Sequence, residues 1–174
     1  ELARLFNDAF AIGAELHVVP VEDWNRSVAE PGHSLHWVPP SPNMPTPDTA
    51  LVYPGTALFE GTNVSEGRGT TRPFEIIGAP FIDAQTLATR MNALELPGVR
   101  FRPAWFTPTF SKHAGTLSGG VQIHVKNREA YRPFRTGLAL LKAVHDLYPQ
   151  ASRFEPVTPP FFDKLAGNGW IRQG

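Results

Sequence analysis

The stretch "IDAQTLATRMNALELPGVRFRPAWF", residues 82–106, places a helical pattern directly before an alternating one. Asp83 is a suitable N-cap for the helix, and Pro97 with Gly98 is a typical helix end. The apolar residues at helical spacing are Leu87, Met91 and Leu94. Residues 99–106 then alternate between apolar and polar side chains, which favours a strand. This stretch therefore predicts a fold that mixes helix and strand.

The segments on either side extend this pattern. Residues 119–127, "GGVQIHVKN", predict a second strand with Val121, Ile123 and Val125 on one face. Residues 132–149 predict a second long helix with Pro133 near its first position. Its expected inward-facing residues are Leu138, Leu141, Val144 and Tyr148. Upstream, residues 49–61 predict a short helix kinked at Pro54. We therefore expect a compact α+β domain over residues 48–174.

The first part of the chain has a different character. Residues 1–15 form an amphipathic helical pattern, and the β-branched run 16–21 follows it as a short strand. A helix followed by a strand is the half-unit of a parallel α/β sheet, so residues 1–21 are predicted to be the C-terminal edge of an upstream α/β domain. Residues 22–47 are rich in proline and are predicted to form a stiff connector. We expect the chain to be a piece of a longer protein.

Composition excludes several classes of protein. Of the 174 residues 41% are hydrophobic, which is enough for a core, and 16 basic residues balance 16 acidic ones. This balance gives no broad positive field for nucleic acid. The chain has no cysteine, which excludes thiolate metal sites and disulfides. No apolar run approaches the roughly 20 residues that a membrane-spanning helix needs.

Residues 53–75, "YPGTALFEGTNVSEGRGTTRPFE", gather charged and hydroxyl groups on a segment interrupted by glycine. Its carboxylates are Glu60, Glu66 and Glu75. Two carboxylates about 5–10 Å apart can hydrolyse a glycosidic bond, as an acid with a nucleophile or a base. The structural alternative is that they pair with Arg68 and Arg72 and only hold the loop in shape. The segment does not fit a phosphate-binding fingerprint.

Two further groups of polar residues are candidates for a site. Residues 106–115, "FTPTFSKHAG", place Lys112 and His113 in a loop with hydroxyl groups, where they could clamp an anionic or polyhydroxylated ligand. The alternative is a solvated turn between two strands. The histidines show no metal-ligand spacing: His33 and His36 are three residues apart but have no accompanying carboxylate. We therefore expect no metal site.

Five segments occur in an order and spacing that resemble a known family. They are "WVPPSPNMPT", "TALVYPGTALFEGTNVSEGRGTTRPFE", "LPGVRFRP", "FTPTFSKHAG" and "GGVQIHV". Together they resemble the bacterial DUF1343 family, whose characterised members are exo-acting β-N-acetylmuramidases of the NamZ type. The resemblance implies a Rossmann-like domain followed by a smaller α+β domain, with the substrate cleft between them. It also implies release of N-acetylmuramic acid from peptidoglycan fragments, no organic cofactor, and a secreted or periplasmic location.

The resemblance further implies that the 53–75 segment faces a sugar. Glu66 and Glu60 are then the expected catalytic carboxylates. Their neighbours in sequence predict that Glu66, between Ser65 and Gly67, has little apolar cover, and that Glu60, after the apolar run 57–59, is turned inward. The expected substrate-binding residues are Asn63, Ser65, Arg68, Arg72, Lys112 and His113. Arg68, Arg72 or Lys112 would pair with the lactyl carboxylate of muramic acid. Aromatic faces would come from Tyr53, Phe59 and Trp105.

One departure limits what this chain is expected to do alone. The family's upstream domain carries a Glu-His-Gly segment that we expect to hold a catalytic acid, and no segment here matches it. The isolated chain is therefore expected to be inactive. Two other hypotheses stay open at this point: a non-catalytic module that binds cell-wall glycan, and a structural domain whose polar loop only stabilises its partner.

Overall fold

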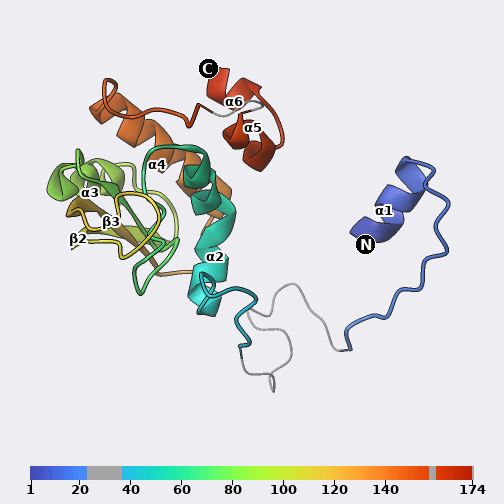
Figure 1. Cartoon of the computed structure of the whole chain (residues 1–174). Helices are drawn as coiled ribbons and strands as arrows, with labels where there is room; N and C mark the ends of the chain where they lie inside the picture. The colour runs from blue at the N-terminus through green and yellow to red at the C-terminus, as the bar shows by residue number, and fades with distance from the viewer. Residues whose placement is uncertain (23–36, 157–159, 174) are drawn as a thin grey trace. The chain divides into compact units, whose positions relative to one another are not determined.

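The computed structural model describes residues 1–22, 37–156 and 160–173, and its contacts divide the chain into two units, Glu1–His36 and Trp37–Gly174 (Figure 1). In the first unit, helix α1 spans Leu2–Ala9 and is shorter than predicted. The side-chain amide of Asn7 bonds both backbone groups of Ala14 and so closes a turn that ends the helix.

The strand predicted over residues 16–21 is not formed. Val18 and Val19 are exposed, and residues 16–21 have no regular secondary structure. A strand is stable only when a neighbouring strand satisfies its backbone groups. Within the described part of the chain no segment pairs with these residues. The predicted connector over 22–47 lies partly outside the described residues.

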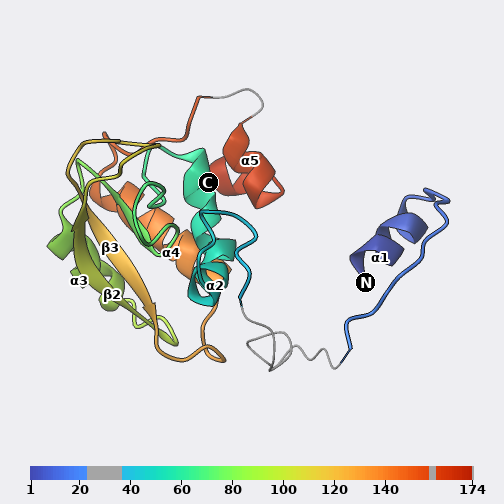
Figure 2. The same cartoon turned by 60° about the horizontal axis from the view of Figure 1, so that its bottom comes forward.

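The second unit contains a three-stranded antiparallel sheet (Figure 2). Its strands are β1 (Ile76–Ala79), β2 (Val99–Phe106) and β3 (Ser118–Val125), in the order β1-β3-β2. The two strands predicted from alternation are confirmed as β2 and β3. Strand β1 was missed because it has only four residues and follows a glycine-rich loop, where alternation gives no signal.

The predicted helices of this unit are also confirmed. They are α2 (Pro47–Thr56), which continues as the 3₁₀ helix η1 (Ala57–Gly61), α3 (Ala84–Asn92) and α4 (Pro133–Leu147). Pro54 lies inside α2, as expected. Asp83 caps α3, because its Oδ1 accepts a hydrogen bond of 2.7 Å from the backbone N–H of Thr86. Two short helices close the chain: α5 (Phe161–Ala166) and α6 (Trp170–Gln173).

Two details of the predicted core are wrong. Leu94 lies beyond the end of α3 and is 39% exposed. In α4 the fully buried leucine is Leu140 and Leu138 is only half-buried, whereas Val144 is buried and Leu141 and Tyr148 pack against the core as predicted. The physical reason is that α4 packs against α2 through Gly137, so a close backbone contact rather than leucine spacing sets the direction of the helix.

The contact between α2 and α4 gives the first prediction. A Cβ atom on Gly137 would overlap the carbonyl oxygen of Gly55 and lie 2.6 Å from its Cα. Gly137→Ala should therefore force the two helices apart and lower the free energy of unfolding by about 1–3 kcal/mol. Urea unfolding measures the change. Lys142→Ala, on the exposed face of the same helix, is the control and should be nearly neutral. A neutral Gly137→Ala would contradict the proposed contact.

Candidate functional site

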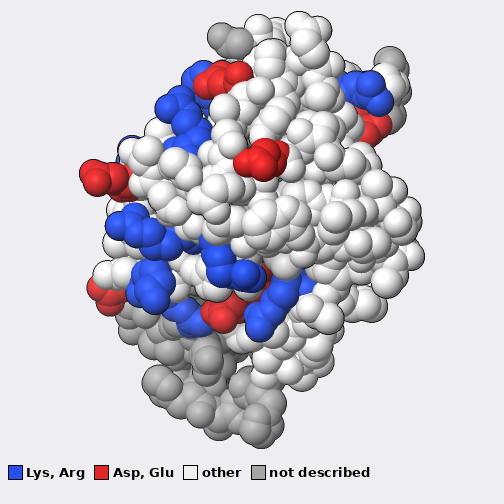
Figure 3. Space-filling view, turned by 90° about the vertical axis from the view of Figure 1, so that its left-hand side faces the viewer, with Lys and Arg blue, Asp and Glu red and all other residues white. Residues whose placement is uncertain are grey.

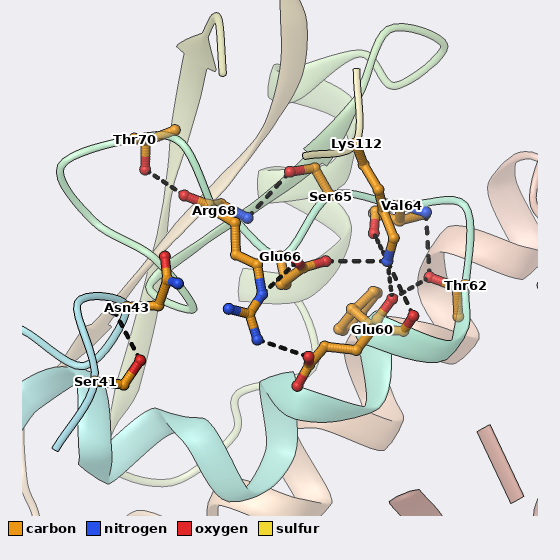
Figure 4. Close-up of polar contacts among 12 residues, drawn as sticks. Ser41, Asn43, Glu60, Thr62, Val64, Ser65, Glu66, Arg68, Thr70 and Lys112 are labelled. Atoms are coloured by element: carbon orange, nitrogen blue, oxygen red, sulfur yellow. Dashed lines mark hydrogen bonds and ion pairs between the residues drawn. The ribbon is translucent and has the colours of Figure 1, made fainter. Parts of the chain in front are cut away.

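Glu66 lies at the centre of a buried polar cluster, which we define as Glu60, Glu66, Arg68 and Lys112 (Figure 4). The Glu66 side chain is only 3% exposed. Its Oε2 accepts a hydrogen bond of 3.0 Å from Nζ of Lys112, and its Oε1 lies 3.1 Å from Nε of Arg68. A buried carboxylate is tolerated when it is paired and hydrogen-bonded, and both conditions are met here.

Arg68 connects the two carboxylates of the cluster. Its Nη2 donates a hydrogen bond of 2.7 Å to Oε2 of Glu60. Its guanidinium carbon lies 5.0 Å from the centre of the Phe74 ring, which allows a cation–π contact. Phe74 has a φ of 63° and is buried beneath this contact. The arginine is therefore held from two sides, and its orientation is fixed before any ligand binds.

Lys112 joins two loops that are distant in sequence. Besides Glu66, its Nζ contacts the carbonyl oxygens of Phe59 at 2.8 Å, Glu60 at 3.2 Å and Val64 at 3.3 Å. An ammonium group has three protons, so these four oxygen atoms use its whole donor capacity. The loop that follows β2 is in this way bound to η1 and to the segment between η1 and β1.

The ion pairs that the structural alternative requires in the 53–75 segment are present, since Glu60 and Glu66 both contact Arg68. Glu75 belongs to a second pair. It is 5% exposed, its Oε2 lies 3.2 Å from Nη1 of Arg72, and its Oε1 accepts a 2.7 Å bond from the hydroxyl of Thr49. Glu75 therefore anchors the start of α2 and lies outside the polar cluster.

The expected exposure of the two candidate carboxylates is wrong. Glu66 was expected to be open to a ligand and Glu60 to be turned inward, but the side-chain exposure is 3% for Glu66 and 17% for Glu60. The cause is tertiary. The backbone of Ser65 pairs with Gly78 of strand β1, and Lys112 reaches over Glu66 from the opposite loop. Glu60 is thus the carboxylate with more access to solvent.

Three predicted substrate-binding residues make contacts within the protein. The Asn63 amide donates to the carbonyl of Ala151 at 2.8 Å and accepts from the backbone N–H of Arg153 at 2.9 Å. Nε2 of His113 lies 2.8 Å from the carbonyl oxygen of Asn63. The hydroxyl of buried Ser65 accepts from the backbone N–H of Gly67 at 3.1 Å. These residues shape the loop, and a contact with sugar stays a prediction for each.

The aromatic residues differ in their access to a ligand. Phe59 is fully buried, so its predicted role as a sugar-stacking face is wrong. Tyr53 packs edge-on against Phe74, with ring centres 4.7 Å apart. Trp105, near the end of β2, is 61% exposed and is free to stack on a ring. The sequence identifies these three residues as aromatic, but only their burial in the folded domain decides whether a ligand can contact them.

Figure 4 labels two polar residues that sequence reasoning did not single out, Ser41 and Asn43. In the view of Figure 4, Ser41 and Asn43 lie on the side of Arg68 that faces away from Lys112. The Ser41 hydroxyl accepts a hydrogen bond of 3.2 Å from the backbone N–H of Asn43. Both residues belong to the proline-rich segment that was predicted to be a connector. Its prolines indicate a stiff, extended backbone and give no indication of a functional role for the polar residues between them.

Within residues 1–22, 37–156 and 160–173, no group of three or more His, Asp or Glu side chains is arranged to hold a metal ion. His33 and His36 lie outside the described residues. Over the same described ranges, none of the helices combines the length and the apolar character that crossing a membrane requires.

Known proteins with this fold define its class. A crystal structure of a DUF1343 family protein from Bacteroides fragilis matches 99% of this chain and 46% of that one, with a TM-score of 0.89 and 30% identity. A second DUF1343 structure from the same bacterium covers 78% of this chain and 34% of that one, with a TM-score of 0.55 and 30% identity. The class is therefore the DUF1343 fold.

The family is defined more narrowly by sequence. Residues 51–174 match the model of the C-terminal domain of the exo-β-N-acetylmuramidase NamZ, and residues 1–48 match that of its N-terminal domain. The chain belongs to the NamZ family, and the predicted resemblance is confirmed. It is 56% identical over 172 residues to the peptidoglycan β-N-acetylmuramidase NamZ of Bacillus subtilis, which covers 99% of this chain. The chain spans 41% of the length of that relative.

Proposed function

We propose that this chain is the C-terminal part of a peptidoglycan-degrading glycoside hydrolase that releases N-acetylmuramic acid from non-reducing ends. The observation that supports this most is the 56% identity to a peptidoglycan β-N-acetylmuramidase, because it extends over 99% of the chain. The matched region therefore spans the segments that carry the polar cluster. A glycan-binding module without catalysis is not favoured by any of these findings.

The polar cluster is the proposed contribution of this chain to the active site. Glu60 and Glu66 are the catalytic carboxylates that we propose this chain contributes, beside the acid proposed in the upstream domain, and Glu60 is the one with access to a substrate. Glu66 fixes the positions of Arg68 and Lys112, which supply positive charge in a partly desolvated place. Charge placed in advance in such a site stabilises the charge that develops in a transition state.

The rest of the cleft is proposed to come from an upstream Rossmann-like domain of the same protein. Residues 1–48 match the N-terminal family model, which supports this arrangement. Its substrate is a peptidoglycan-derived saccharide, and peptidoglycan lies outside the cytoplasmic membrane, so a secreted or periplasmic location is part of the proposal. The chemistry of two carboxylates and two cations requires no organic cofactor.

A chromogenic aryl β-N-acetylmuramide tests the proposed function. The full-length protein should hydrolyse it and should leave the matching aryl β-N-acetylglucosaminide, which lacks the lactyl carboxylate, nearly untouched. The 174-residue chain by itself should be inactive, because the proposed upstream acid is missing. Absence of turnover by the full-length protein would reject the hydrolase. Turnover by the 174-residue chain would place the complete catalytic pair within it.

A further inference from the structure

The two faces of the sheet differ: one is apolar and faces a helix, and the other carries basic side chains. On β2, Val99 and Phe101 are buried, whereas Arg100 and Arg102 alternate with them and are exposed. In the strand register, Arg100 lies opposite His124 and Arg102 lies opposite Gln122. Residues two apart on a strand share a face and are about 6.6 Å apart, so the two arginines form a row.

Two more cations extend this row. Lys126 follows the end of β3 and is exposed, and Arg72 is half-exposed in the loop before β1. We define the basic face as Arg72, Arg100, Arg102 and Lys126. The side of the molecule shown in Figure 3 carries a gathering of Lys and Arg with fewer acidic groups among them. The chain as a whole has 16 basic and 16 acidic residues. An excess of basic residues on one side therefore means that basic and acidic residues are unevenly distributed over the surface.

The positive charge of the basic face is largely uncompensated. Arg102 donates a hydrogen bond of 2.6 Å to Oε1 of Gln122, a neutral amide that orients the guanidinium and leaves its charge intact. Among the described residues, Arg100 and Lys126 have no carboxylate within ion-pair distance, and Arg72 alone pairs with one, Glu75. The four cations and this single carboxylate leave a surplus of three positive charges by simple count.

We propose that the basic face binds the peptide-free glycan strand beyond the cleaved residue, through the lactyl carboxylates of successive muramic acid units. This inference rests on the proposed function. Each muramic acid unit carries one carboxylate when no peptide is attached, so the strand is a regular polyanion. Arginine forms paired hydrogen bonds with a carboxylate, so exposed arginines on one sheet face suit a chain that carries carboxylates.

His124 contributes little charge to this face at neutral pH. Burial lowers the pKa of His124, and the positive charges of Arg102, Lys126 and Arg72 lower it further, while Glu75 acts in the opposite direction. The imidazole is therefore neutral at pH 7, and the charge of the basic face comes from arginine and lysine. Strand binding should accordingly change little between about pH 7 and pH 8.

Fluorescence anisotropy of glycan strands labelled at the reducing end tests the proposal with the full-length protein. We expect affinity for peptide-free strands to fall as salt rises from about 20 to about 300 mM, because exposed charges are screened. Arg100→Gln together with Arg102→Gln should weaken binding at low salt by about fivefold or more. Arg90→Gln is the control, since Arg90 is a comparably exposed arginine on α3. Thermal unfolding confirms that each variant is folded.

Strands whose carboxylates have been converted to neutral amides form the second arm. They should bind weakly, without salt dependence, and equally to wild type and the double variant. Equal affinity for native and amidated strands, or a double variant that binds like wild type, would overturn the inference. Preference for strands that still carry stem peptides would assign the face to peptide carboxylates and would also overturn it. Salt-dependent binding without aryl muramide turnover would reject only the proposed hydrolase.

Discussion

Glu66→Gln in the full-length protein is expected to lower kcat on an aryl β-N-acetylmuramide by about 10²–10³-fold. The carboxylate of Glu66 holds both Lys112 and Arg68, with contacts of 3.0 and 3.1 Å. A glutamine has one acceptor oxygen and one amide donor group, so its NH₂ would face one of the two cations. The cluster would also carry an unbalanced positive charge. Both effects displace the groups that we propose act on the substrate.

A loss of activity could also follow from reduced stability, and Glu75→Gln controls for this. Glu75 is a carboxylate with similar burial, 5% exposed, and it pairs with Arg72 in the same segment but outside the polar cluster. Glu75→Gln should lower the melting temperature and leave kcat within a few-fold of wild type. Equal losses of kcat in the two variants would show that Glu66 has only a structural role.

Lys112→Met is expected to be the most damaging change for stability, with a loss of about 3–5 kcal/mol in the free energy of unfolding. Methionine fills a similar volume but donates no hydrogen bond. Glu66 would keep only Arg68 as a partner, and the carbonyl oxygens that Lys112 contacts would lose their donor. Since small domains are stable by about 5–15 kcal/mol, the variant should unfold at much lower urea concentrations.

The matched control is Lys142→Met, which removes an exposed lysine whose partner is Asp146 one helical turn away. Such a pair contributes about 0.3–0.5 kcal/mol, so little change is expected. Lys112→Met combined with Glu66→Gln should be less destabilised than the sum of the two single variants, because the buried charge is removed together with its partner. Simple additivity would mean that the two side chains do not interact.

Local sequence was sufficient wherever the physical cause of a structure lies within a few residues. Asp83 caps α3 through a contact three residues away, and Pro54 is placed inside α2. The alternation in β2 likewise follows from the period of a strand. The prediction of a strand at 16–21 was wrong because a strand depends on a neighbouring strand, which the local pattern cannot supply. Burial of Leu140 in place of Leu138 depends on the contact between α4 and α2.

For the candidate site, the sequence by itself determined which charged groups are available and which family the loops belong to. It also offered pairing of the glutamates with Arg68 and Arg72 as an alternative, because opposite charges lie close together on one short segment. Only the tertiary structure decided that Glu66 is buried and Glu60 more open. Lys112 is 46 positions from Glu66 in sequence, and the sheet brings its loop over the carboxylate. Burial is produced by whichever segments pack over a residue, so its own neighbours in sequence do not reveal it.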